Sequence, residues 1–439
     1  MLFFRYNFLM LDYKFIAENL HAVTANIADR FMKADAQEVA RLYAKRTELT
    51  TDLQALQQKR NANAAAMKGK LDQEARNALI EEGKKLKDEI ASLETELAQT
   101  ENDLLTEARK IPNMAHPDAP VGKEDKDNLE IKRVGEPTVF DFDAVDHVKL
   151  GQELDIIDFD SGTKVSGTKF YYLKNEGVFL ELGLVRYALE ILQKKGFTPF
   201  ITPDVAREEI LEGIGFNPRG AESNVYTLEG EDACLVGTAE ITLGGYYSNM
   251  ILPKEKLPLR MAGLSHCFRR EAGAAGQFSK GLYRVHQFTK VEMFIFCLPE
   301  ESNGFHEELR LIEEEIFKSL DIPFRVVDTC TGDLGAPAYR KWDLEAWMPG
   351  RASVPSHNGG EWGEVTSTSN CTDYQARRLN IRFKDDDGKN KFVHMLNGTA
   401  IAVSRAIIAI LENFQQADGS VRIPKALIPY VGFDVIKKK

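Results

Sequence analysis

The chain has 439 residues, of which 43% are hydrophobic and 28% charged, a composition typical of a folded globular protein and not of a disordered or fibrous one. A net charge of −11 argues against non-specific affinity for polyanions over the whole surface, but it does not exclude a local basic site. No apolar run reaches the roughly 18 residues that a membrane span needs. Five scattered cysteines without a CxxC pair indicate neither a disulfide framework nor a zinc site, so we expect a cytoplasmic protein with no membrane partner and no zinc.

The first eleven residues are mainly apolar, with one charged residue, Arg5. They lack the small-residue cleavage site that follows the apolar region of a signal peptide. We expect no targeting signal, and Met10 is a plausible alternative to Met1 as the start of the protein.

Residues 38–110 contain no proline, and their apolar residues recur at steps of three, four and seven. This spacing is typical of helices that bury a single stripe. Gly69 can adopt the positive φ of a tight reversal, so the segment predicts an antiparallel hairpin of two helices, each on the order of 45 Å long. Basic residues gather on the first helix and near the tip: Arg41, Lys45, Arg46, Lys59, Arg60, Lys68 and Lys70.

Such a hairpin has two possible uses. Dimerisation is the commoner use of a heptad pattern. A projecting basic ridge, however, suits an RNA helix, which proteins recognise mostly by shape and phosphate contacts. We therefore expect an N-terminal RNA-binding domain over residues 1–112.

Three prolines between residues 111 and 122 end the arm and mark a linker to a second domain, 113–439. From about residue 140 helical and β-rich stretches are interspersed, and many strands follow one another without a crossover helix. This order predicts an α+β fold with a mainly antiparallel sheet. The chain has neither a GxxxxGK[ST] phosphate loop nor a GxGxxG turn between a strand and a helix.

The segment 261–296 predicts a strand, a loop of small residues and a second strand. Arg269 and Glu271, two residues apart, are expected on one face of the first strand. One face of the second strand is expected to present Arg284, His286, Phe288, Lys290, Glu292 and Phe294. A solvated charged face fits poorly, because Phe288 lies among the charges. These residue types together predict a site for a nucleotide and an amino acid. An arginine can bind phosphate, an aromatic ring can stack on a base, and a carboxylate can bind an amine.

Three stretches resemble the motifs of class II aminoacyl-tRNA synthetases. FRREAG followed by RVHQF (268–288) resembles motif 2. Residues 184–205, a helix and then a strand ending in Pro203, are similar to motif 1, and residues 397–413, a strand and then a helix, are similar to motif 3.

Further stretches narrow the resemblance to the seryl-tRNA synthetases of bacteria and organelles. They are VGTAE at 236–240, EVTSTSNCTDYQARR at 364–378 and the helical arm. The resemblance covers nearly the whole chain from Met10. It implies an antiparallel class II sheet flanked by helices and preceded by an antiparallel two-helix coiled-coil arm.

The resemblance also implies an activity: activation of L-serine with ATP to seryl-adenylate, followed by transfer to the 3′ end of tRNA(Ser), and also of tRNA(Sec) where one exists. It implies a homodimer built by motif 1, in which the arm of one subunit reaches tRNA bound at the other. Two alternatives remain. One is a ligase that loads an amino acid onto a carrier protein, and the other is an inactive RNA-binding paralogue.

The family's roles carry over to positions that match its motifs. The catalytic set is Arg269, Glu271 and Arg405. Serine is expected at Thr238, Glu240, Arg269, Glu292, Asn397 and Thr399. ATP is expected at Arg269, Arg270, Glu271, Arg284, Val285, Phe288, Glu364, Val365, Thr366, Ser367 and Arg405. Mg²⁺ is expected at Glu364 and Ser367, and tRNA at Arg41, Lys45, Arg46, Lys59 and Arg60. Whether Glu240 or Glu292 holds the serine ammonium is left open.

Overall fold

The computed structural model describes residues 11–69, 71–217, 223–271, 281–351 and 359–438. The chain divides into two compact units, residues 1–114 and 115–439. No helix within the described ranges is long and apolar enough to cross a membrane.

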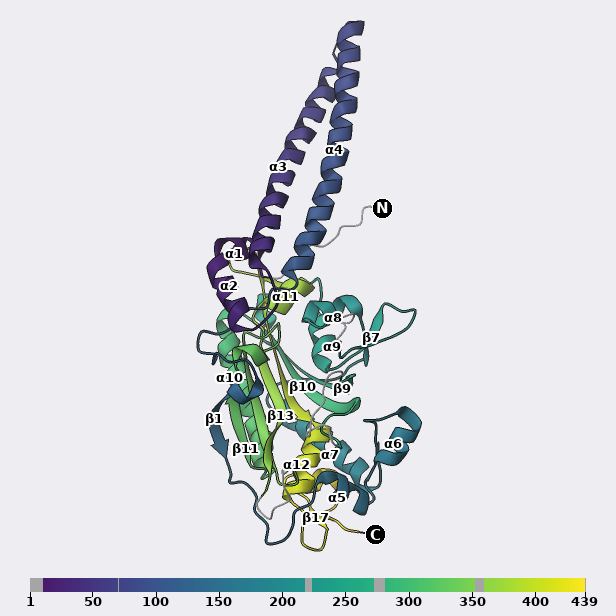
Figure 1. Ribbon diagram of the computed structural model, residues 1–439, viewed down its shortest axis with the longest axis vertical. Coiled ribbons are helices and arrows are strands. Elements are labelled where there is room, and N and C mark those ends of the chain that lie inside the picture. Colours follow the sequence, from purple (N-terminus) through teal and green to yellow (C-terminus); the bar gives the residue numbers. More distant parts are fainter. Residues whose placement is uncertain (1–10, 70, 218–222, 272–280, 352–358, 439) are drawn as a thin grey trace. The chain divides into compact units, whose positions relative to one another are not determined.

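The first unit contains a long helical hairpin, which confirms the predicted coiled-coil arm (Figure 1). The helices of this unit are α1 (Tyr13–Glu18), α2 (Leu20–Asp29), α3 (Ala36–Ala66) and α4 (Gln73–Ala108). Each arm helix begins at an aspartate cap. Asp35 accepts hydrogen bonds from the main-chain N–H groups of Gln37 and Glu38, and Asp72 accepts one from Ala75. With 31 and 36 residues, α3 and α4 are about 47 and 54 Å long.

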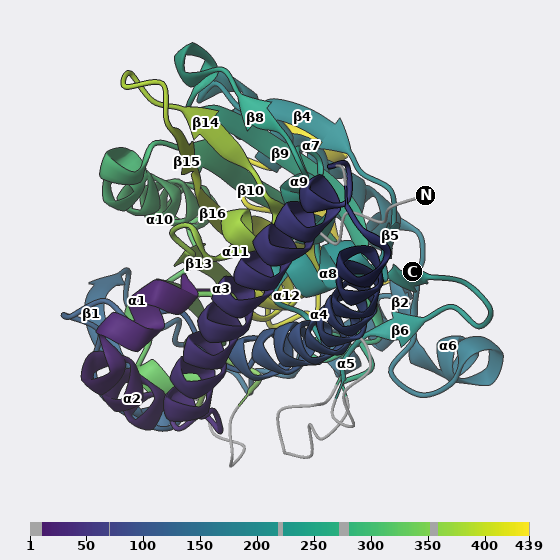
Figure 2. The ribbon, with the colours of Figure 1, turned by 90° about the horizontal axis from the view of Figure 1, so that it is seen from above.

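The predicted apolar stripe lies between the two arm helices. Leu49 on α3 and Leu86 and Ile90 on α4 are buried. At the base of the arm, Val39, Leu42, Leu104 and Ala108 join α1 and α2 in a small core that also contains Ile16, Val23, Ile27 and Ile111. Figure 2 shows α1 and α2 beside the first turns of α3. The base is therefore part of a packed core, whereas the distal arm buries only its seam.

Eight of the described strands form the central sheet of the second unit, in the order β1-β11-β12-β13-β16-β10-β9-β4. Their bounds are β1 (Leu129–Val134), β11 (Phe324–Asp328), β12 (Arg340–Met348), β13 (Glu361–Asn370), β16 (His394–Ala402), β10 (Gln287–Cys297), β9 (Leu259–Phe268) and β4 (Thr198–Ile201). All neighbours pair antiparallel except β4 and β9, which are parallel. The predicted antiparallel α+β sheet is confirmed.

Helices cover the two sheet faces unequally. The helices α7 (Glu176–Lys194), α10 (Ser302–Ser319) and α12 (Val403–Asn413) pack on the face to which Val291, Met293 and Ile295 of β10 point. On the other face, α8 (Glu208–Ile214), α9 (Ala239–Gly245) and α11 (Tyr374–Leu379) pack around Phe294 and Phe296. The part of this second face that they leave uncovered contains the site described below.

Shorter elements complete the second unit. The remaining helices are η1 (Asp125–Asp127), α5 (His147–Glu153), α6 (Phe159–Ser166), η2 (Lys254–Lys256), η4 (Pro299–Glu301), η5 (Thr331–Asp333) and α13 (Ile428–Val431). The remaining strands are β2 (Ile157–Asp158), β3 (Tyr172–Leu173), β5 (Val205–Arg207), β6 (Tyr226–Thr227), β7 (Ala233–Leu235), β8 (Ile251–Leu252), β14 (Arg382–Lys384), β15 (Asn390–Phe392), β17 (Val421–Arg422) and β18 (Val435–Ile436).

The helix-strand order predicted for 184–205 is present as α7 and β4. The strand ends at Ile201, two residues before the predicted end at Pro203, although the Thr202 N–H still donates to the main-chain oxygen of Leu264.

Candidate active site

A pocket of about 250 Å³ lies on the sheet face opposite α7, α10 and α12. Residues from β10, β13 and β16, from the start of α9, from the first turn of α12 and from the segments beyond the ends of β9 and β10 converge on it. Its lining residues are Phe216, Thr238, Glu240, Arg269, Glu271, Tyr283, Val285, Phe288, Lys290, Glu292, Glu364, Val365, Thr366, Ser367, Ser369, Asn397, Thr399, Ala402, Ser404 and Arg405.

The lining includes all six residues predicted to bind serine. It also includes every residue predicted to bind ATP except Arg270 and Arg284. Sequence reasoning assigned no role to Phe216, Tyr283, Ser369, Ala402 or Ser404. Ser369 lies two residues beyond Ser367 on the same strand, so strand alternation was a signal that could have found it.

A β-bulge brings Glu364 and Ser367 to one face, although they are three residues apart. On β13, Thr366 pairs with Leu344 of β12 and Glu364 pairs with Glu345, which leaves Val365 as an extra residue. Without the bulge, residues 364 and 367 would point to opposite faces. A second bulge, at Ala400 of β16, lets Thr399 and Ala402 line the same pocket.

The strands that carry motif 2 are shorter than predicted. Arg269 and Glu271 lie beyond β9, which ends at Phe268, and Arg284 and His286 lie before β10, which begins at Gln287. The ladder stops because the His286 N–H donates to the main-chain oxygen of Lys169, although the Arg269 N–H still donates to the oxygen of His286.

The residues beyond the strand ends therefore do not follow strand alternation. Glu271 adopts a φ of 46°, in the left-handed region. Its carboxylate faces Arg284 at 3.3 Å, on the rim of the pocket. The Arg270 N–H donates to the main-chain oxygen of Asn224, and the Arg270 side chain does not line the pocket.

One end of the pocket is built around Glu240. Its Oε1 accepts hydrogen bonds from Gln375 Nε2 at 2.7 Å and from Asn397 Nδ2 at 2.9 Å. Burial, reinforced by the negative charge of Glu292, raises the pKa of Glu240 to about 7, against the opposing effects of Gln375, Lys290 and Arg269. Gln375 lies in the recognised 364–378 stretch, but its role was not predicted.

Glu292 lines the same pocket, close enough to Glu240 to raise its pKa, and its carboxylate forms contacts with two neighbouring side chains. It forms an ion pair with Lys290 and accepts a hydrogen bond of 3.4 Å from the Thr399 hydroxyl. Lys290 also donates to Thr399 Oγ1 at 3.4 Å. Because Lys290 and Glu292 are 6% and 2% exposed, this pair is shielded from solvent, and a structural ion pair is part of the wall of the pocket.

The other end of the pocket holds an aromatic ring and two arginines. The Arg269 guanidinium lies 5.3 Å from the centre of the Phe288 ring. Arg405 donates to the main-chain oxygen of Glu364 at 2.9 Å and lies 3.1 Å from its carboxylate. Desolvation works against ionisation of Glu364, but the positive charges of Arg405, Lys341 and Arg269 outweigh it and lower the pKa of this carboxyl.

Within the part of the chain that the structure describes, no group of three or more histidine, cysteine, aspartate or glutamate side chains could hold a metal ion. The five cysteines are buried. Glu364 and Ser367 together offer one carboxylate and one hydroxyl to the pocket.

The basic residues predicted for the arm fall into two groups. Arg41 pairs with Glu38 at 2.6 Å, Lys45 with Glu96 at 2.8 Å, and Arg46 with Glu101 at 3.0 Å. Lys59 and Arg60 are exposed and have no ion-pair partner among the described residues. Lys70 lies outside the described residues. The strongest positive potential of α3 is therefore expected in its distal half.

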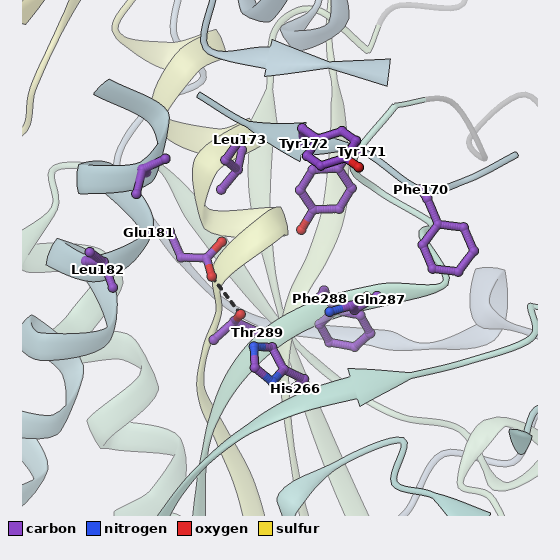
Figure 3. Close-up of a pocket in the computed structure, with 11 residues that line it drawn as sticks. Phe170, Tyr171, Tyr172, Leu173, Glu181, Leu182, His266, Gln287, Phe288 and Thr289 are labelled. Atoms are coloured by element: carbon purple, nitrogen blue, oxygen red, sulfur yellow. Dashed lines mark hydrogen bonds between the residues drawn. The ribbon is translucent and has the colours of Figure 1, made fainter. Parts of the chain in front are cut away.

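A second hollow, of about 260 Å³, shares Phe288 with the first pocket (Figure 3). Phe170, Tyr171, Tyr172, Leu173, Val178, Glu181, Leu182, His266, Gln287, Phe288 and Thr289 line it. In the close-up, the Glu181 carboxylate accepts a hydrogen bond of 2.7 Å from the Thr289 hydroxyl. This hollow is mainly apolar and lacks the convergent charges of the first pocket.

Comparison with known proteins agrees with this geometry. Residues 225–414 match the family model of the class II tRNA synthetase core domain (G, H, P, S and T), and residues 10–115 match that of the seryl-tRNA synthetase N-terminal domain. The chain is 70% identical to a serine–tRNA ligase of Treponema denticola, over 97% of this chain and all of that protein. It is 58% identical to one of Borrelia recurrentis, over 98% of this chain and all of that protein.

Solved structures give the same result. A seryl-tRNA synthetase of Pyrococcus horikoshii complexed with ATP superposes with a TM-score of 0.90 and 41% identity, over 98% of this chain and all of that chain. A cytoplasmic serine–tRNA ligase of Naegleria fowleri in complex with AMP gives a TM-score of 0.85 and 29% identity, over 98% and 99% of the two chains. The chain belongs to the seryl-tRNA synthetase family.

Proposed function

We propose that this chain activates L-serine with ATP to form seryl-adenylate and pyrophosphate, and then transfers the seryl group to the 3′ end of tRNA(Ser). One observation carries the proposal. The carboxylates and hydroxyls assigned to serine line a single pocket of about 250 Å³ together with Arg269, Arg405 and Phe288, which are assigned to ATP.

The first step needs no nucleophile from the enzyme. The serine carboxylate attacks the α-phosphorus of ATP, and the bond from that phosphorus to the pyrophosphate oxygen breaks. What the enzyme supplies is alignment and stabilisation of the developing charge. Arg269 is assigned to the α-phosphate and the serine carboxylate, because it lines the pocket, contacts the Phe288 ring and is near enough to Glu240 to influence the pKa of that carboxyl.

The residues at the Glu240 end suit a small amino acid with a hydroxyl group. Glu240 and Glu292 provide negative charge for the ammonium, and Asn397 and Thr399 provide polar groups for the hydroxyl. Alanine would leave these polar groups unpaired, and this penalty favours serine strongly. The hydrogen bonds from Asn397 and Gln375 and the ion pair with Lys290 leave open which carboxylate binds the ammonium.

Mg²⁺ is assigned to Glu364 and Ser367. A carboxylate whose pKa is lowered is a suitable hard oxygen ligand, and Mg²⁺ is usually held by one or two protein groups together with substrate phosphates. When bound, the ion would neutralise phosphate charge. Phe288 and Arg405 are assigned to the two faces of the adenine, by stacking and by a cation–π contact.

The helical arm is assigned to the tRNA. Lys59 and Arg60 are the best candidates for phosphate contacts, because their charges are not neutralised by described acidic neighbours. The same contact would serve tRNA(Sec), whose charging we also propose.

We further propose a cytoplasmic homodimer. On and next to α7 and β4, apolar side chains are exposed that a monomer would normally bury: Phe179 is 57%, Leu182 60% and Ile201 85% exposed. These elements carry motif 1, and Val178 and Leu182 of α7 line the hollow of Figure 3.

Serine-dependent exchange of labelled pyrophosphate into ATP tests the first step. We expect exchange with serine and little with alanine or glycine. Exchange with glycine or alanine but not serine would instead favour the carrier-protein ligase, and no exchange with any amino acid would favour the inactive paralogue. Charging of purified tRNA(Ser) with labelled serine tests the second step.

A further inference from the structure

Tyr283 lines the active-site pocket and lies against two arginines. The guanidinium carbon of Arg405 is 4.7 Å from the centre of the Tyr283 ring, and that of Arg351 is 4.0 Å from the same centre. Tyr283 lies four residues before the start of β10, and Arg405 lies on the first turn of α12. Both distances are within the range in which a cation is attracted to the face of an aromatic ring.

The contact with Tyr283 fixes a degree of freedom that the other contacts of Arg405 leave open. The hydrogen bond to the main-chain oxygen of Glu364 and the ion pair with its carboxylate are both made by Nη1 of Arg405. Contacts through this one nitrogen still allow the rest of the guanidinium to move. The Tyr283 ring, over which the guanidinium carbon lies, restricts this movement.

Arg351 holds Tyr283 in turn. Its main-chain N–H donates to the oxygen of Met348, and its guanidinium passes over Gly363 of β13. A Cβ atom at Gly363 would come within 2.2 Å of Arg351 Nη1, so glycine at this position leaves room for the arginine. The negative face of the Tyr283 ring offsets part of the repulsion between the two guanidinium groups.

We propose that Tyr283 is a positioning residue that holds the Arg405 guanidinium for stacking on the adenine of ATP. The guanidinium carbon lies over the face of the Tyr283 ring, and Arg405 and Phe288 line the same pocket. Adenine then stacks between this guanidinium and Phe288. The inference rests on the proposed function, because it takes ATP as the ligand of this pocket.

The test compares Tyr283→Leu with Tyr283→Phe. Leucine removes the ring, so the KM and the Kd for ATP should rise about 2- to 30-fold, the range of a cation–π contact. Phenylalanine keeps the ring and should restore ATP affinity to within about twofold of wild type. The KM for serine should change far less than the KM for ATP.

Arg405→Ala separates positioning from simple packing. If Tyr283 acts through Arg405, Tyr283→Leu should have little further effect on ATP affinity in the Arg405→Ala enzyme. A full additional loss in that background would overturn the proposal, as would unchanged ATP affinity in a folded Tyr283→Leu enzyme. Should the leucine variant not fold, Tyr283→Met carries the same expectation.

Different results would contradict the proposed function and the role of Tyr283. A wild-type enzyme without serine-dependent exchange would contradict the proposed function, and calorimetric ATP binding would still test Tyr283. A wild-type enzyme that exchanges normally, with Tyr283→Leu unchanged in ATP affinity, would contradict only the role of Tyr283.

Discussion

Serine binding should weaken as the pH falls from 8 to 6, because of the environment of Glu240. Burial and the nearby charge of Glu292 raise the pKa of Glu240 to about 7, so a large fraction of the free enzyme carries a neutral carboxyl at neutral pH. The ammonium of serine brings a positive charge into the same pocket and favours the ionised form. This holds whichever of the two carboxylates contacts the ammonium directly.

The magnitude follows from the ionised fraction. With a pKa of about 7, Glu240 is ionised in about nine-tenths of the molecules at pH 8 and in about one-tenth at pH 6. If serine binds only the ionised form, the Kd for serine should be about tenfold higher at pH 6 than at pH 8. Binding at pH 7 should release about half a proton.

Isothermal titration calorimetry of serine at pH 6, 7 and 8, in buffers of different ionisation enthalpy, measures both the Kd and the proton release. Glu240→Gln is the matched control, since it keeps the shape of the side chain but cannot ionise. At pH 8 this variant should bind serine more weakly than the wild type, and its affinity for serine should be nearly independent of pH. Equal wild-type affinities at pH 6 and 8, or the same pH dependence in Glu240→Gln, would refute the reasoning.

Three further predictions concern phosphate and RNA. Arg269→Ala should lower the rate of serine-dependent pyrophosphate exchange by about 100- to 1,000-fold, as expected for loss of a donor to developing charge, and an unchanged rate would exclude its assigned role. Replacing residues 47–99 by a short linker keeps the base core of Val39, Leu42, Leu104 and Ala108, and should abolish tRNA charging while exchange stays within about twofold of wild type. Equal loss of both activities in a folded truncation would contradict this division of labour. Lys59→Ala/Arg60→Ala should lower kcat/KM for tRNA and the salt dependence of charging more than Arg41→Ala/Lys45→Ala, whose residues are already paired with Glu38 and Glu96; equal effects would argue against phosphate contacts at the distal positions.

The arm was predictable because one-dimensional periodicity determines it. A long run without proline, with apolar residues on one stripe, has few alternatives to a helical hairpin, and α3 and α4 agree with it. The pairing of its charges was not predictable. Lys45 and Arg46 meet Glu96 and Glu101 only because of the register between the helices, which the spacing of the leucines alone does not specify.

The residue types of the site were predictable, but the backbone that presents them was not. Strand alternation correctly placed Phe288, Lys290 and Glu292 on one face. Arg269 and Glu271 also line the same pocket, but not as strand residues, because β9 ends at Phe268. Alternation alone could not have brought Glu364 and Ser367 together without the bulge at Val365. Hydrogen bonds to distant segments, such as that from His286 to Lys169, end the strands, and they are tertiary features.

The most direct test of the account is a structure of the protein with a non-hydrolysable seryl-adenylate analogue. The account predicts the seryl group between Glu240, Glu292 and Thr399, the phosphate or its substitute at Arg269, and the adenine between Phe288 and Arg405. An analogue bound outside this pocket, or one with its adenine away from Phe288 and its seryl group away from both carboxylates, would contradict the claim that the two substrates meet there.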